Sequence, residues 1–161
     1  LQGRLPPSST EHVMSELSLT SLYQQLILEH YRKPRNKGEL PEKTVEIHMA
    51  NPVCGDEIRL QLQVEGGRIL DARDVGQGCS ISQAAVSMMT NLLKGKDLTD
   101  DEGLAKRFTD MMHGDEEPAR DKTLGDLRAL QGVSKFPVRI KCALLAFDCL
   151  QEAIKKTRGE E

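Results

Sequence analysis

Residues 58–67, IRLQLQVEGG, decide the fold class of this chain. Every second residue from Ile58 to Val64 is apolar, and this period of two predicts a β-strand with one buried face. The two glycines that follow can both adopt positive φ, so they predict a hairpin turn into another strand at about 68–75. An earlier alternating segment at 45–49 predicts one more strand. Together these segments predict a three-stranded antiparallel sheet.

On both sides of this sheet the apolar period changes from two to that of a helix. A first helix should begin near Ser18 or Thr20 and end before Pro34, because proline cannot continue the hydrogen-bond ladder. A capping box of Thr99 and Glu102 predicts the start of another helix. The remaining helices are expected from Cys79 to Gly95, around residues 124–130, and from about Pro137 to Lys156. The predicted fold class is therefore α+β, with the sheet packed against about five helices.

Length and charge limit the possible functions. The chain has 161 residues, which suits a single domain, here expected over 14–157. Residues 1–13 are expected to be a disordered leader or an added tail, and residues 158–161 a C-terminal tail. A net charge of -3 and only 3% aromatic residues argue against nucleic-acid binding. Neither a membrane-spanning run nor a signal peptide is visible, so a cytoplasmic protein that binds no membrane is expected.

Four cysteines then favour metal or redox chemistry over disulfides, given a reducing compartment. Cys54 and Asp56 flank a glycine in a tight turn, where a thiol and a carboxylate can face one point. Cys79 lies where a Gly-rich turn meets a helix N-terminus, which favours the thiolate. Cys142 lies near the start of the last helix. The chain has no CxxC pair. Spacing alone therefore supports a shared metal site about as well as it supports unrelated cysteines buried in the core.

The other polar candidates have simpler interpretations. Cys149 lies two helical turns beyond Cys142 among apolar residues, which predicts a core position. His48 alternates with apolar neighbours and should face solvent, while His30 and His113 are expected at the surface or at helix ends. The basic cluster over 32–37 is interpreted as a solvated turn that could also dock an acidic patch.

Three motifs carry a resemblance to a known family: NPVCGD at 51–56, GQGCSIS at 76–82 and RIKCALLAF at 139–147. The segment LYQQLILEHYRKPRN at 22–36 extends it. With these motifs the chain resembles the NifU N-terminal/IscU-like superfamily of iron–sulfur cluster assembly proteins, which implies an IscU-like fold. Within it the chain looks most like the SufU branch. Two differences from IscU-type proteins indicate this branch. Lys141 lies where those proteins carry a histidine, and the stretch around 100–125 is longer than theirs.

The resemblance implies a zinc-dependent sulfurtransferase. Such a protein accepts persulfide sulfur from a PLP-dependent, SufS-type cysteine desulfurase and serves SufBCD-type cluster assembly machinery. Whether this makes it an enzyme in its own right stays open. Cys54 would be the sulfur acceptor, and the implied Zn²⁺ ligands are Cys54, Asp56, Cys79 and Cys142.

Two other functions fit the same four residues. Three thiolates and a carboxylate could instead hold a [2Fe–2S] cluster on a scaffold that assembles and transfers it. A zinc-stabilised interaction module is the third possibility, although structural zinc sites favour closely paired knuckles that this chain lacks.

Overall fold

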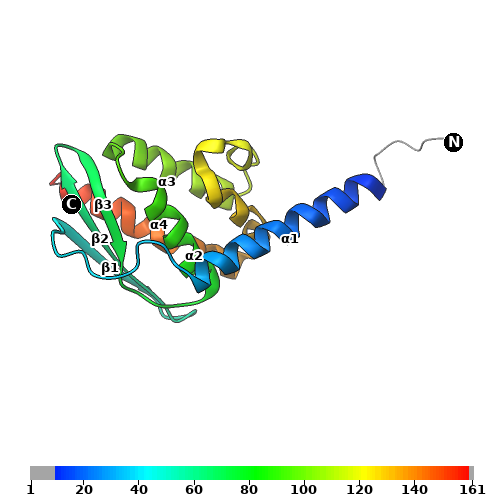
Figure 1. Ribbon diagram of the computed structural model, residues 1–161, viewed down its shortest axis with the longest axis horizontal. Helices are drawn as coiled ribbons and strands as arrows, with labels where there is room; N and C mark the ends of the chain where they lie inside the picture. Colours follow the sequence, from blue (N-terminus) through cyan, green and yellow to red (C-terminus); the bar gives the residue numbers. More distant parts are fainter. Residues whose placement is uncertain (1–9, 160–161) are drawn as a thin grey trace.

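The computed structural model describes residues 10–159, so residues 1–9 of the expected leader and the last two residues of the expected tail lie outside it. Figure 1 shows a small sheet with the helices gathered on one side of it. In chain order the elements are α1 (Thr10–Arg32), β1 (Val45–Asn51), β2 (Asp56–Glu65), β3 (Arg68–Asp74), α2 (Ser80–Leu93), α3 (Leu98–Met112), the 3₁₀ segments η1 (Pro118–Arg120) and η2 (Lys122–Lys135), and α4 (Pro137–Thr157). The α+β prediction is confirmed.

The sheet is antiparallel with strand order β1-β2-β3, so the predicted three-stranded antiparallel sheet is confirmed. Ile58, Leu60 and Leu62 on β2 are completely buried, so the apolar face of the predicted strand is the face that meets the helices. The β2–β3 turn has φ of +61° and +76° at its two glycines, which L-residues rarely adopt. The opposite face of β2 is partly covered as well, because Leu40 N donates to the buried side chain of Gln61 at 2.7 Å.

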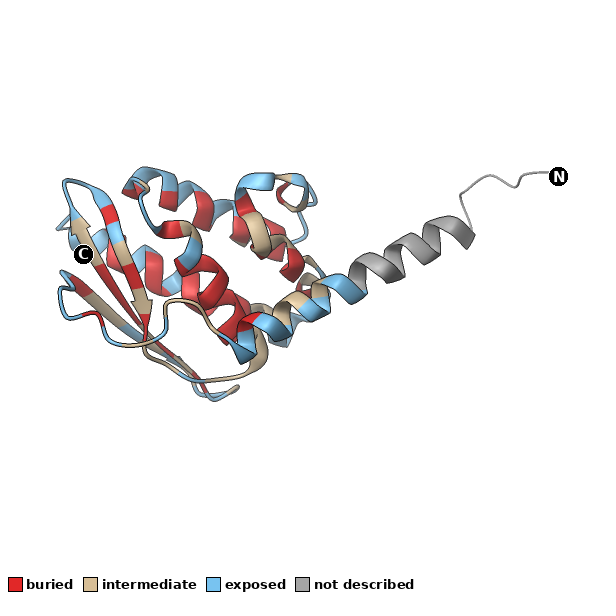
Figure 2. Cartoon of the chain, in the orientation of Figure 1, coloured by how far each residue is buried: buried red, intermediate tan, exposed pale blue. Residues whose placement is uncertain are grey.

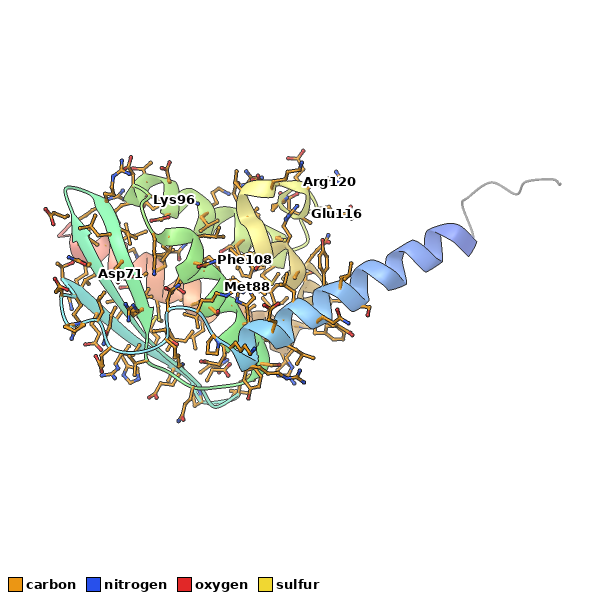
Figure 3. All side chains as sticks on the ribbon, viewed as in Figure 1. Asp71, Met88, Lys96, Phe108, Glu116 and Arg120 are labelled. Carbon is orange, nitrogen blue, oxygen red and sulfur yellow. The ribbon has the colours of Figure 1, made fainter. Side chains whose placement is uncertain are left out.

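Helices α2 and α4 pack against the sheet, while α1 lies against α2 and α3 against α4. Buried residues therefore concentrate along α2, α4 and the inner face of β2 (Figure 2). Phe108 of α3 stacks on Phe147 of α4 with ring centroids 4.3 Å apart. In Figure 3, Phe108 and Met88 lie in the interior, whereas Glu116 and Arg120 lie at the edge of the molecule. Within residues 10–159, no helix combines the length and apolar character needed to cross a bilayer.

Several predicted helix boundaries differ from the structure. Helix α1 already includes Thr10, well before the expected caps. The capping box of Thr99 and Glu102 is wrong, because α3 begins at Leu98 and both residues lie within its first turns. Arg158 at the end of α4 contacts both side chains instead, 3.5 Å from Thr99 Oγ1 and 2.8 Å from Glu102 Oε1. These two side chains therefore take part in a tertiary contact, while the N-cap residue Asp97 makes no side-chain capping bond.

His30 was expected at the surface or at a helix end; it lies in the last turn of α1 but not at the surface. Its side chain is completely buried between α1, α2 and η2. Nδ1 lies 2.7 Å from Ser87 Oγ, and Nε2 lies 2.8 Å from Asp126 Oδ2. These partners come from positions 57 and 96 residues away along the chain, so the local sequence carries no sign of them. Paired in this way, a histidine can be buried without an unsatisfied polar atom.

Candidate metal centre

The turn between β1 and β2 presents Cys54. Asn51 Oδ1 accepts the backbone N–H of Val53 at 3.2 Å, and the Asn51 carbonyl accepts that of Cys54, also at 3.2 Å. Gly55 closes the turn with φ of +70°, a value that glycine adopts without a steric penalty. Asn51 pairs with Asp56 across the ladder, so the strand starts immediately at Asp56. The result is a half-buried thiol beside a carboxylate that is only 1% exposed.

A second loop, residues 75–79, lies against the start of β2, next to this turn. Gln77 and Glu57 exchange two backbone hydrogen bonds of 2.7 and 2.9 Å. The approach is so close that a Cβ on Gly76 would lie 2.1 Å from the Glu57 carbonyl oxygen, and one on Gly78 would lie 2.6 Å from Asp56 Oδ1. Both glycines of the GQG motif are therefore required by packing. Because these glycines have no side chains, the N-terminus of α2 can pack directly against Asp56.

Three of the four predicted ligands meet at one point. The donor atoms of Cys54, Asp56 and Cys142 all lie within 4.8 Å of one another, and the Cys54 and Cys142 sulfurs are 2.9 Å apart. Cys142 comes from α4, where its thiol also lies 3.8 Å from the Val138 carbonyl oxygen one turn earlier. Zinc holds sulfur at about 2.3 Å and carboxylate oxygen at about 2.0–2.2 Å. These three donors can therefore reach a single ion with small side-chain movements.

Cys79 lies next to this cluster but is not among the three donors. It is the N-cap of α2, and its sulfur accepts the backbone N–H of Ser82 at 3.5 Å. Its own backbone N–H donates to Asp56 Oδ1 at 2.9 Å. The predicted position at a helix N-terminus is therefore correct. In this structure the sulfur caps the helix, so its assignment as a fourth ligand stays a prediction.

The electrostatics of the cluster suit a cation. Asp56 Oδ1 accepts two hydrogen bonds, from Cys79 N and from Ser82 Oγ at 3.0 Å. Asp56 Oδ2 is buried and has no hydrogen-bond partner among the described residues. Burial, reinforced by the Cys54 thiol, the Asp56 carboxylate and the charge of Cys79, raises the pKa of Cys142 far above its usual range. A metal ion would satisfy the free carboxylate oxygen and stabilise the thiolates together.

The residues expected outside the centre lie outside it. Cys149 is fully buried on α4, and burial raises the pKa of its thiol to about 12. His48 is exposed and pairs with Glu57 at 2.8 Å. Two residues near the centre were not predicted from the sequence: Ser82, whose hydroxyl donates to Asp56, and Lys37, which was expected in a solvated turn. Only the position of Ser82, three residues after the N-cap Cys79, could have pointed to it.

The fold and the donor set define a small α+β domain that gathers thiols and one buried carboxylate at the end of a three-stranded sheet. The chain belongs to the family described as NifU-like N terminal domain, which matches residues 22–160.

Individual relatives cover most of the chain. It is 49% identical over 143 residues to the zinc-dependent sulfurtransferase SufU of Bacillus subtilis, covering 88% of this chain and 95% of the relative. It is 40% identical to the iron–sulfur cluster assembly scaffold protein IscU of Streptococcus pyogenes, over 92% of each chain. A solved structure from Fervidobacterium islandicum, described as a candidate iron–sulfur cluster assembly scaffold for the SUF system, aligns with a TM-score of 0.73 and 29% identity. That alignment covers 84% of this chain and 98% of the solved one.

Proposed function

We propose that this protein is a zinc-dependent sulfurtransferase of iron–sulfur cluster assembly. It would accept persulfide sulfur from a PLP-dependent cysteine desulfurase and pass it to downstream cluster assembly machinery. The similarity to the Bacillus subtilis sulfurtransferase supports this function. One structural observation carries it: within the thiol and carboxylate cluster, Cys54 is a half-buried thiol on a turn, whereas Cys142 is buried on a helix.

The proposed zinc ligands are those implied by the sequence: Cys54, Asp56, Cys79 and Cys142. Cys79 would join the other three by giving up its capping bond to Ser82 N–H, which at 3.5 Å to sulfur is a weak bond. When bound, zinc supplies positive charge that keeps the cysteines deprotonated and shields them from oxidation.

The turn allows Cys54 to act as the acceptor. Its backbone is held by Asn51 and Gly55 and not by a helix, so its side chain can move without disturbing α4. The Cys54 thiolate would attack the outer sulfur of the donor persulfide, so that a new S–S bond forms on Cys54. The donor's S–S bond breaks at the same time, and the desulfurase cysteine leaves as a thiolate. No external oxidant is needed, because the transferred sulfur keeps its oxidation state.

An exposed apolar rim beside the cluster supports docking of a partner protein there. We define the rim as Val53, Phe136 and Val138, which are 84%, 60% and 64% exposed. Val53 precedes the acceptor cysteine in its turn. Phe136 is the N-cap residue of α4, and Val138 lies one helical turn before Cys142. Exposed large apolar side chains close together commonly mark interaction sites. A desulfurase seated on this rim would hold its persulfide over Cys54.

Desulfurase turnover in the presence of a reductant tests the proposal. The wild-type protein should accelerate sulfide release, and Cys54→Ser should abolish that acceleration while Cys149→Ala retains it. Mass spectrometry should then find an added 32 Da on Cys54 alone. Undiminished acceleration by Cys54→Ser would remove the acceptor role from this residue.

A scaffold for a [2Fe–2S] cluster is the second candidate, favoured by the similarity to the Streptococcus pyogenes scaffold protein. The same soft thiolates can ligate iron. The metal content of the purified protein separates the two. Zinc together with desulfurase acceleration supports sulfur transfer, whereas iron with a visible cluster spectrum supports the scaffold.

A further inference from the structure

Lys37 is part of the basic segment between α1 and β1, yet its ammonium group is fully engaged with the protein. Nζ lies 3.1 Å from Asp74 Oδ2 and 3.1 Å from Gln83 Oε1, and it also donates to the Gly76 carbonyl oxygen. A lysine has three N–H donors, so each is used. The side chain is 37% exposed, while that of Asp74 is 3% exposed. Lys37 is therefore a structural cation and not a free surface charge.

From Lys37 a chain of hydrogen bonds leads into the cluster. Gln83 accepts from Lys37 through Oε1 and donates through Nε2 to Ser82 Oγ at 3.3 Å. Ser82 Oγ in turn lies 3.0 Å from Asp56 Oδ1. The three inner members are buried, with exposures of 7% for Gln83, 0% for Ser82 and 1% for Asp56. We call these four residues the Lys37 relay.

Each hydrogen bond of the relay determines which group donates in the next one. The positive charge of Lys37 selects the orientation of the Gln83 amide, with oxygen toward the lysine and nitrogen toward Ser82. Because Gln83 then occupies a lone pair of Ser82 Oγ, the hydroxyl proton is available to Asp56 Oδ1 or to the Cys79 carbonyl oxygen, 3.2 Å away. A bond to Oδ1 leaves Oδ2 as the free oxygen of the carboxylate.

The same lysine also secures the second loop of the centre. Its bonds to Asp74 and to the Gly76 carbonyl oxygen hold the start of the loop that leads to Gly78, where a Cβ would lie 2.6 Å from Asp56 Oδ1. Asp74 is anchored independently, since Oδ1 accepts the backbone N–H of Arg59 at 3.2 Å. Lys37 is therefore linked to Asp56 both through side chains and through the loop.

We propose that Lys37 and Gln83 are positioning residues for the metal: they hold Asp56 so that Oδ2 faces the ion, and thereby set how tightly the ion is held. This inference rests on the metal site of the proposed function but not on sulfur transfer. Partners that orient a ligand from outside the coordination sphere typically change metal affinity by about 10- to 100-fold when mutated.

Two variants interrupt the relay at different points. Lys37→Met removes the ammonium and keeps the length of the aliphatic stem. Gln83→Glu keeps the size and the contact with Lys37, but it loses the N–H that donates to Ser82 and offers the serine proton a competing acceptor. Lys33→Met is the matched control, because Lys33 is an exposed lysine of the same basic segment.

Zinc affinity measured against a chromophoric chelator should fall roughly tenfold in both relay variants and stay unchanged in Lys33→Met. The charge-transfer and ligand-field bands of the cobalt(II)-loaded protein should shift in the relay variants, because carboxylate coordination changes. The Tm of metal-free Gln83→Glu should stay close to that of the metal-free wild type.

Unchanged zinc affinity and an unchanged cobalt spectrum in Gln83→Glu would overturn the inference, and so would a lowered metal-free Tm in both variants without any change in metal binding. The second result would make the relay a fold contact alone. A wild-type protein that binds zinc but never accelerates a desulfurase would refute the proposed function and leave this inference standing.

Discussion

Replacing Gly78 by alanine should damage the metal centre without adding or removing any ligand. The new Cβ would lie 2.6 Å from Asp56 Oδ1, 2.7 Å from Ser82 Oγ and 2.9 Å from Asp56 Cα. Ordinary contact begins at about 3.4 Å, so the carboxylate oxygen would have to retreat by about 0.8 Å. A metal site tolerates ligand displacements of only about 0.2 Å. Zinc affinity should therefore fall by at least the 10- to 100-fold typical of a lost outer partner.

Chelator competition measures this loss, with circular dichroism at the same temperature to confirm that the variant is folded. Gly103→Ala is the matched control. Gly103 lies within α3 with ordinary φ and nothing within 4 Å of the new methyl group, so the zinc affinity of the Gly103→Ala protein should equal that of the wild type. Its stability should rise by about 0.5–1 kcal/mol, because alanine is the better helix former. A folded Gly78→Ala protein with wild-type zinc affinity would refute the placement of Asp56 at the metal.

Two further predictions concern the fold. Burial raises the pKa of Asp101 from 3.8 to about 7, so the folded state favours the protonated acid. The free energy of unfolding is therefore highest below pH 3.8, the pKa of the unfolded chain, and falls as the pH rises to 7. At about 1.4 kcal/mol per pKa unit, the part of this loss that falls between pH 5 and pH 7 is about 3 kcal/mol. Urea unfolding at pH 5 and pH 8 should show this loss in the wild type and a smaller one in Asp101→Asn; an equal pH dependence in both proteins would contradict the prediction. Phe108→Ala removes the ring stacked on Phe147 and should cost about 3–5 kcal/mol of unfolding free energy, whereas a loss below about 1 kcal/mol would mean that the core refills the cavity.

The strands and the long helices could be predicted because their information is local. The alternation from Ile58 to Val64 specifies which face of β2 is buried, and the glycine pair after it permits only a tight turn. The helix after Cys79 and the one from Pro137 are likewise encoded by period and capping, and both begin where expected. Boundaries failed at the start of α1, which lies before the expected caps, and at the start of α3, where Thr99 and Glu102 contact Arg158 and form no capping box.

The candidate metal centre was also predictable only in its local features. Local sequence marked Cys54, Asp56 and Cys79, since each lies in a turn or cap formed by its immediate neighbours. It could not show that Cys142, 88 residues after Cys54, approaches to 2.9 Å, or that Cys79 directs its sulfur to a helix cap.

The sequence by itself determined the elements of this protein and the local setting of each predicted ligand, because hydrogen-bond periodicity and turn geometry act over a few residues. The tertiary structure alone decided which side chains meet. It placed Asp56 with one oxygen anchored and the other free, it buried His30, and it turned Lys37 from a surface charge into the outer end of a relay. The physical reason is that a buried polar group must find its partner wherever the packed chain places one.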